Sequence, residues 1–165
     1  NGTFMYEIGE REIKFMARAI KLSLQGMRNG DGGPFGSVVV KGDEVVGEGW
    51  NQVLTHNDPS AHAEVVAIRD ACRRLGTFQL SDCEIYTSCE PCPMCLGAIY
   101  WARPQRVFYA NTKEEAAAIL FDDSFIYREI ELPHGQRKIP FISLPQEGER
   151  EVFREWDRKE NKKLY

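Results

Sequence analysis

Apolar residues near the start of the chain recur every three or four positions, which is the spacing of one face of an α-helix. This pattern predicts a helix over Arg11–Met27, with the following residues on its apolar face: Ile13, Met16, Ala17, Ile20, Leu24 and Met27. A glycine-rich stretch over residues 29–34, closed by a proline, ends the helix. Two short strand-like runs follow at Ser37–Val40 and Glu44–Gly47, and they predict a β-hairpin.

The rest of the chain alternates between strand-like and helical stretches. A loop over Thr55–Pro59 leads into a helix over Ser60–Leu75, for which Gly76 is a suitable C-cap. Pro93 opens a third helix, because a proline at the first helical position loses no hydrogen bond, and Pro104 ends it. The other predicted elements are strands over Glu84–Thr87 and Arg106–Tyr109 and helices over Thr112–Leu120 and Gln146–Lys163. This order of elements predicts a single layered α/β domain.

Length, composition and charge narrow the choice of partner. The 165 residues suit one domain, and 42% hydrophobic with 28% charged residues is ordinary for a globular protein. The net charge of −4 argues against a nucleic-acid partner, since proteins that bind a phosphate backbone usually carry a basic surface. No apolar run approaches the roughly 18 residues of a membrane span, so we expect no membrane partner. The first residues lack the pattern of a signal peptide, and Met5 is a candidate native start.

The five cysteines are clustered, since Cys89, Cys92 and Cys95 fall within seven residues. A secreted disulfide framework spreads an even number of cysteines over a smaller chain. The clustering therefore favours ligation of a metal by thiolates in a reducing compartment, and we expect a cytoplasmic protein.

Two short motifs, each at the start of a predicted helix, carry the candidate chemistry. Residues 62–64 (His-Ala-Glu) open the second helix, and residues 91–95 (Pro-Cys-Pro-Met-Cys) open the third. The strand between them can bring the two helix starts side by side. In this order they form the H-x-E…P-C-x-x-C pattern that is typical of zinc deaminases of nucleobases.

The residue types in these motifs suit a catalytic metal. His62, Cys92 and Cys95 give zinc three protein ligands and leave a fourth position for water, whereas a structural zinc is closed by four protein ligands. Cys92 and Cys95 are three positions apart, so their sulfurs share one side of a helical turn. A helix N-terminus also favours the thiolate form. Deamination needs a group that moves protons from water to the substrate, and Glu64 is the candidate.

Cys89 leaves one alternative open. Together with His62, Cys92 and Cys95 it could close a four-ligand zinc site in a non-catalytic module that mediates protein contacts. We favour a buried thiol for Cys89, because it precedes the helix on the strand side, where its sulfur would point elsewhere. The presence of Glu64 and Asn51 also argues against the module, since a structural site needs neither of them.

The sequence further resembles the cytidine deaminase superfamily, and within it the small bacterial guanine deaminases, from about Met16 to Tyr165. The zinc motif is common to the superfamily, so discrimination rests on residues 121–125 (Phe-Asp-Asp-Ser-Phe) and the terminal residues 161–165 (Asn-Lys-Lys-Leu-Tyr). The other stretches that carry the resemblance are residues 32–36, Asn51, and residues 61–64, 88–95 and 100–104.

The resemblance implies a three-layer α/β/α fold with a central five-stranded sheet, and deamination of guanine to xanthine and ammonia. It implies a homodimer in which the C-terminal segment, about residues 146–165, is swapped and closes the site of the partner. It also implies one zinc ion per subunit, with His62, Cys92 and Cys95 as ligands and Glu64 as proton shuttle. The expected substrate-binding residues are Asn51, the backbone N–H of Ala63, Phe35, Asp123, Tyr165 and Trp101.

Several of these residues and the substrate have competing interpretations. Phe35 and Trp101 suit a hydrophobic core, Asp122 or Asp123 suits a helix cap, and Tyr165 suits a frayed chain end. A guanosine deaminase would share much of the pattern and differ mainly in making room for ribose. A tRNA adenosine deaminase would have to bind a folded RNA, which the net charge does not favour. A cytosine deaminase lacks support from Asp123 and the C-terminal segment.

Overall fold

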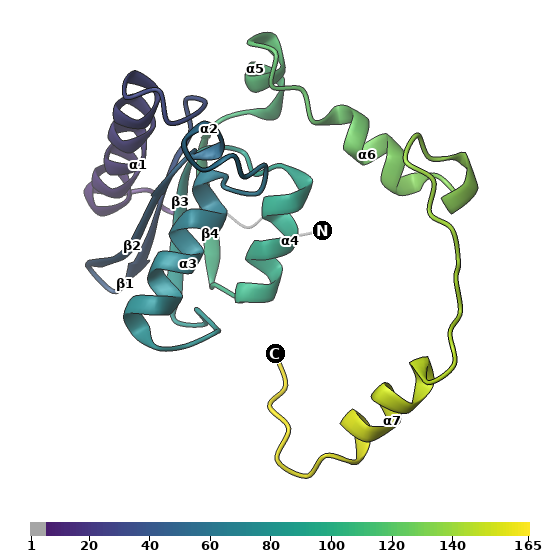
Figure 1. Cartoon of the computed structure of the whole chain (residues 1–165). Coiled ribbons are helices and arrows are strands. Elements are labelled where there is room, and N and C mark those ends of the chain that lie inside the picture. The colour runs from purple at the N-terminus through teal and green to yellow at the C-terminus, as the bar shows by residue number, and fades with distance from the viewer. Residues whose placement is uncertain (1–5) are drawn as a thin grey trace. The chain divides into compact units, whose positions relative to one another are not determined.

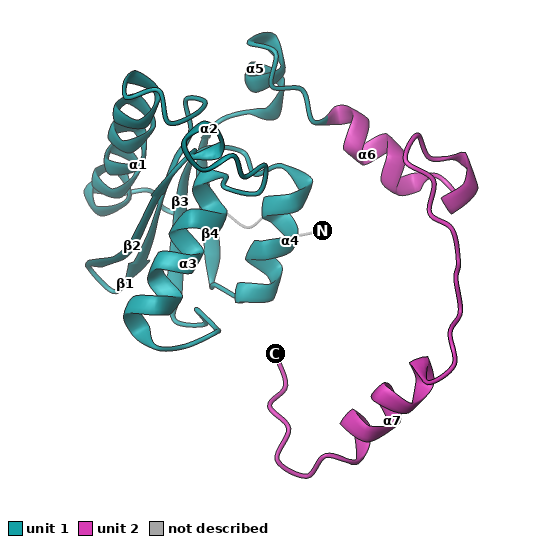
Figure 2. Ribbon diagram, in the orientation of Figure 1, with its two compact units in different colours: residues 1–123 teal, residues 124–165 magenta. Residues whose placement is uncertain are grey.

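The computed structural model of the chain describes residues 6–165, so the candidate start Met5 lies outside the described residues. The chain divides into two compact units (Figure 2): unit 1 ends at Asp123, and unit 2 covers Ser124–Tyr165. Unit 1 contains a β-sheet and both zinc motifs, whereas unit 2 consists of short helices and extended segments.

Unit 1 is built around a mixed sheet with the strand order β2-β1-β3-β4. Its strands are β1 (Gly36–Lys41), β2 (Glu44–Trp50), β3 (Cys83–Cys89) and β4 (Arg106–Asn111). β1 is antiparallel to both β2 and β3, whereas β3 and β4 run parallel. β3 is buried along its whole length, because it lies inside the sheet and helices cover both faces.

The expected fifth strand is not found: within residues 6–165 the sheet has four strands. The last extended apolar stretch, residues 138–145, forms no ladder with another strand. Its Pro140 and Pro145 lack the N–H group that a ladder uses, and its side chains Ile139, Ile142 and Leu144 are exposed. This stretch therefore adds no strand to the sheet.

The helices of unit 1 cover the two faces of the sheet, which confirms the predicted three-layer α/β/α arrangement (Figure 1). α1 (Glu10–Arg28) lies on one face, and α3 (Ala63–Leu75) and α4 (Pro93–Ala102) lie on the other. Successive side chains of β1 alternate between the two cores. Val38 and Val40 pack in the core under α1 with Phe15, whereas Val39 packs in the core under α3 with Ala67. The short helices α2 (Val53–His56) and α5 (Lys113–Ala118) complete the unit.

Glycines in β2 allow α3 to lie directly on the sheet. A Cβ atom at Gly49 would lie 2.3 Å from the carbonyl oxygen of Ala63 and 2.5 Å from the backbone nitrogen of Ala67. A Cβ atom at Gly47 would meet the same helix one turn further along, 2.6 Å from the carbonyl oxygen of Ala67. These distances are far below an ordinary contact, so glycine at both positions fixes where α3 begins. That start is where the first zinc motif lies.

Most predicted elements are present, with ends that differ by a few residues. α3 begins at Ala63 rather than Ser60, with His62 as its N-cap, and Gly76 ends it in the left-handed conformation, as predicted. α2 overlaps the predicted loop and was not expected, because four residues are too few to show a helical period. Contacts from a distant part of the chain hold it, since the N–H groups of Leu54 and Thr55 both donate to the carbonyl of Asp31.

Unit 2 contains α6 (Ser124–Glu131), the 3-10 helix η1 (His134–Gln136) and α7 (Glu149–Arg158). α6 was not predicted, and α7 is shorter than the predicted helix Gln146–Lys163. None of the side chains in these three helices is buried. No helix in the described part of the chain is long and apolar enough to cross a membrane.

Candidate metal centre

Three ligand-type side chains from the two sequence motifs meet at one point of unit 1. The Nδ1 atom of His62 lies 3.5 Å from the Sγ atom of Cys92 and 3.5 Å from that of Cys95. The ligand atoms of all three residues lie within 4.8 Å of one another. The structure therefore brings together the three residues that the sequence predicts as metal ligands.

The starts of two neighbouring helices bring this cluster together. His62 is the N-cap of α3 and Cys92 is the N-cap of α4, and both have extended backbones. Neither side chain caps its own helix, so both are free to face the cluster. Pro93 occupies the first turn of α4, as predicted, and Cys95 follows in the same turn, where it is buried. The partial positive charge of a helix N-terminus favours thiolates at this point.

The charges within the cluster fit a bound cation. The hydrogen bond from the Cys95 thiol, together with the neighbouring His62, lowers the pKa of Cys92 to about 4. The same hydrogen bond and burial raise the pKa of Cys95, while the hydrogen bond to Cys92 raises the pKa of His62. Two thiolates this close repel each other unless a cation lies between them. One imidazole and two thiolates form a donor set that zinc binds, so the residues present fit this ion.

Glu64 lies in the first turn of α3, two residues after His62, and is almost fully buried. Its Oε1 atom accepts a hydrogen bond of 2.7 Å from the hydroxyl of Thr87 in β3. Burial away from water raises the pKa of this carboxyl above its ordinary value. A buried carboxylate beside a metal-ligand cluster is placed to move protons at that cluster.

Cys89 lies apart from the three-residue cluster. It is the last residue of β3, and its Sγ atom contacts the carbonyl oxygen of Thr112 at 3.7 Å. Burial raises the pKa of its thiol to about 11, and its Sγ atom is not part of the group of ligand atoms that His62, Cys92 and Cys95 form. This arrangement is that of a buried thiol, and it gives no support to a closed four-ligand site.

Two predicted substrate residues, Asn51 and Phe35, lie side by side next to the glycine-rich turn that follows α1. The backbone N–H of Asn51 donates to the carbonyl of Phe35 at 3.0 Å. The side-chain oxygen of Asn51 accepts from the N–H of Val53 at 3.1 Å, so its amino group is left to donate to a ligand. The ring of Phe35 packs edge-to-face on Phe121, with ring centroids 5.0 Å apart.

Asp123, the last residue of unit 1, is within electrostatic reach of the cluster. Burial raises the pKa of its carboxyl, and the nearby charge of Cys92 raises it further. Asp123 also directly precedes α6, so its position suits a helix cap as well as a substrate contact.

The other predicted substrate residues occupy three different settings. Ala63 is fully buried at the first position of α3, where its backbone N–H has no partner within the helix. Trp101 lies in the last turn of α4, about 9 Å along the helix axis from Cys95, and is 61% exposed. Tyr165 ends unit 2 and is exposed.

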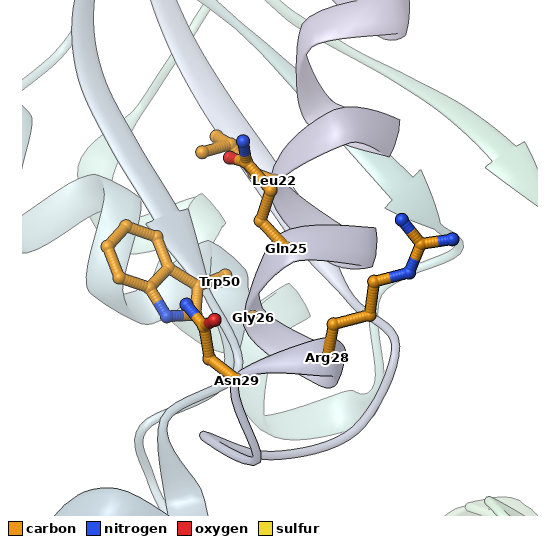
Figure 3. Close-up of a pocket in the computed structure, with 6 residues that line it drawn as sticks. All are labelled: Leu22, Gln25, Gly26, Arg28, Asn29 and Trp50. Carbon is orange, nitrogen blue, oxygen red and sulfur yellow. The ribbon is translucent and has the colours of Figure 1, made fainter.

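Asp31, which the sequence did not single out, fixes the chain on both sides of Asn51. Its carboxylate accepts hydrogen bonds from the indole N–H of Trp50 at 2.8 Å and from the hydroxyl of Thr55 at 2.7 Å. The hydrogen bonds from Thr55 and Trp50 lower the pKa of Asp31. Trp50 also packs on the last turn of α1 beside a cavity of about 430 Å³ (Figure 3). The partners of Asp31 lie 19 and 24 positions away, which is why no local pattern indicated them.

Comparison with known proteins supports the two motifs. The family model of the cytidine and deoxycytidylate deaminase zinc-binding region matches residues 10–111. The guanine deaminase of Bacillus subtilis is 55% identical over 151 residues, which cover 92% of this chain and 97% of that protein. The tRNA-specific adenosine deaminase of Aquifex aeolicus is 31% identical over 126 residues, which cover 76% of this chain and 81% of that protein.

Solved structures give the same picture. The X-ray structure of guanine deaminase from Bacillus subtilis matches with a TM-score of 0.91 at 52% identity, over 96% of this chain and 99% of that chain. A structure of guanine deaminase from Nitrosomonas europaea matches with a TM-score of 0.64 at 30% identity, over 72% of this chain and 68% of that chain.

Proposed function

The chain belongs to the cytidine and deoxycytidylate deaminase family, and on this premise we propose that it is a zinc-dependent guanine deaminase. It hydrolyses guanine to xanthine and ammonia. The observation that carries this proposal is the similarity to the Bacillus subtilis guanine deaminase over 92% of the chain. That match extends well beyond residue 111, where the region common to the family ends, and so includes residues 121–125, on which the resemblance to guanine deaminases partly rests.

The metal site consists of His62, Cys92 and Cys95, with one zinc ion per subunit. Zinc held there supplies a Lewis acid that lowers the pKa of water toward about 7, which provides a nucleophile at neutral pH. The three side chains act as ligands, and the N-terminus of α4, where both cysteines lie, favours the thiolate form that zinc binds.

Glu64 moves the protons of the reaction. It accepts a proton from the water that attacks C2 of guanine and gives this proton to the adjacent ring nitrogen. It then transfers the remaining hydroxyl proton to the amino group. The C2–N bond breaks, ammonia leaves, and the C2 carbonyl of xanthine forms. Each transfer uses the same carboxylate, which lies two residues from the ligand His62.

The base is held by groups that match its edge and its flat face. The free amino group of Asn51 and the backbone N–H of Ala63 donate to ring and carbonyl acceptors of the base. The carboxylate of Asp123 accepts from a ring N–H, which guanine offers. Phe35 stacks on the base and Trp101 borders the pocket, which Tyr165 of the partner subunit completes in the proposed homodimer.

We expect a homodimer in which the C-terminal segment, about residues 146–165, closes the site of the partner copy. Unit 2 supports this proposal, because its helices bury no side chain and leave apolar residues such as Phe125, Ile130 and Phe153 exposed. Such a segment gains stability when it packs on another surface, and a closed site excludes water from the reaction. The five free cysteines are consistent with a cytoplasmic setting, where thiols stay reduced.

The test is ammonia release from guanine, guanosine, cytosine and adenosine, each with and without a zinc chelator. We expect chelator-sensitive release from guanine alone. Release from guanosine alone would retain the zinc chemistry and refute the proposed pocket. A protein that contains zinc and releases ammonia from none of the four would refute the proposed function.

A further inference from the structure

Thr87 lies directly behind the proposed proton carrier. It is a fully buried residue of β3, two positions before Cys89. Its side chain lies on the face of the sheet that α3 covers, the same face as Ile85, which packs against α3. From there the Thr87 hydroxyl contacts the Oε1 atom of Glu64 at 2.7 Å.

This hydrogen bond distinguishes the two oxygens of the carboxylate. A hydroxyl has one hydrogen to donate, and 2.7 Å is an ordinary distance for a hydrogen bond from a hydroxyl to a carboxyl oxygen. When Glu64 carries a proton on Oε2, Oε1 remains a carbonyl oxygen and still accepts from Thr87. A proton on Oε1 could be donated to the Thr87 oxygen instead, but the buried hydroxyl hydrogen of Thr87 would then lose the one acceptor that it has among the described residues. The contact therefore favours Oε2 as the atom that carries the proton.

The surroundings of Thr87 make it a rigid support. β3 is paired on both sides, with β1 and with β4, and it is buried along its length. The branched Cβ of threonine restricts its side chain to few rotamers, so the hydroxyl cannot easily turn away. Supporting groups on rigid elements hold a reactive side chain in one orientation.

We propose that Thr87 is a positioning residue, which holds Oε1 of Glu64 and leaves Oε2 as the oxygen that accepts and returns the proton. This inference rests on the proposed function, because it assigns a role within that reaction. The hydroxyl of Thr87 contacts Glu64, so its role in the reaction is exerted through that carboxylate.

The sheet supplies a matched control in Ser37. This residue of β1 lies opposite Thr87 in the strand pairing and is also fully buried. Among the described residues, its hydroxyl is the one buried side-chain oxygen without a hydrogen-bond partner. The two neighbouring hydroxyls thus differ in whether they contact Glu64.

The test compares kcat and KM for guanine in Thr87→Val, Thr87→Ser and Ser37→Ala, each at equal zinc content. Loss of a hydrogen bond to a charged group corresponds to roughly a tenfold change or more. We expect Thr87→Val to lower kcat by about tenfold or more, with KM within about twofold of wild type. Thr87→Ser should restore most of the rate, and Ser37→Ala should match wild type. If Thr87→Val does not fold, Thr87→Ala takes its place.

A second readout does not depend on turnover. Thr87→Val should lower the midpoint of thermal unfolding in the wild-type background and much less in a Glu64→Ala background, where the hydroxyl has lost its partner. Equal shifts in both backgrounds would overturn the inference, as would a wild-type kcat in Thr87→Val. A Thr87→Ser variant as slow as Thr87→Val would also overturn it, because the methyl group and not the hydroxyl would then matter. Inactivity of the wild type on guanine would count against the proposed function, and the unfolding comparison would still decide whether Thr87 holds Glu64.

Discussion

Gly49→Ala is expected to disturb the metal site through the start of α3. The added Cβ atom would lie 2.3 Å from the carbonyl oxygen of Ala63, whereas an ordinary contact is about 3.4 Å or longer. The start of α3 must therefore move by about 1 Å. His62 directly precedes Ala63, so the imidazole moves with the helix, while zinc tolerates only about 0.2 Å in its ligand distances.

The magnitudes follow from this forced movement. Overpacking of this kind costs about 1–3 kcal/mol. In a chain of this size, that loss lowers the midpoint of thermal unfolding by roughly 3–10 °C. Displacement of a supported metal ligand typically weakens metal binding by about 10- to 100-fold, and we expect a loss of zinc affinity in this range.

Gly47→Ala is the matched control for this prediction. Its Cβ atom would strain the same helix from the same strand, 2.6 Å from the carbonyl of Ala67, but one turn further from His62. We expect a similar loss of thermal stability in both variants, measured by circular dichroism, and a loss of zinc affinity in Gly49→Ala alone, measured by competition with a chromophoric chelator. Wild-type zinc affinity in Gly49→Ala, or an equal loss in both variants, would refute the argument that Gly49 positions His62.

Three further changes test other parts of the site. Glu64→Gln should retain zinc and lose nearly all turnover, and a near-normal rate would remove Glu64 from the mechanism. Asp31→Asn should raise KM for guanine more than it lowers kcat, because Asp31 fixes the chain on both sides of Asn51 without touching the proposed reacting atoms. Since the folded state lowers the pKa of Asp31, its contribution to stability is present above the ordinary aspartate pKa and is lost as the pH falls through the folded value. The difference in unfolding midpoint between wild type and Asp31→Asn should therefore shrink in acid, and a constant difference would contradict the assignment. Deletion of Asn161–Tyr165 should lower the activity per folded molecule and leave the midpoint of thermal unfolding nearly unchanged. A large drop in that midpoint with unchanged activity per folded molecule would argue against a closing role for the C-terminus.

The layers of unit 1 and the metal cluster could be predicted from the sequence because their signals are local. The apolar spacing over residues 11–27 predicts the helix α1, and Pro93 marks the start of α4 at its correct residue. The predicted apolar face of α1 was wrong, because the structure buries Phe15, Ala19 and Leu22, whereas Ile13 and Ile20 are exposed. The metal cluster is equally local, since each motif fits within five residues and the strand between the motifs joins them. The prediction of a fifth strand was wrong because it came from the resemblance, whereas residues 138–145 find no partner strand in the described structure.

The supporting residues could not be predicted, because their roles exist only after strands and helices have packed. From the sequence, Thr87 is an ordinary strand residue. Its contact with Glu64, which is 23 positions away in the chain, arises only when α3 packs on the sheet. From the sequence, Gly49 would be expected to weaken its strand. In the structure it is one of the two glycines that allow α3 to lie directly on the sheet. The proposed ligands and the proposed proton carrier can thus be predicted from motifs, but the groups that fix their orientation follow from the register of the sheet. Gly49→Ala in β2 and Thr87→Val in β3 leave both motifs unchanged. Both substitutions should nevertheless alter zinc affinity or turnover, an effect that the motifs alone do not predict.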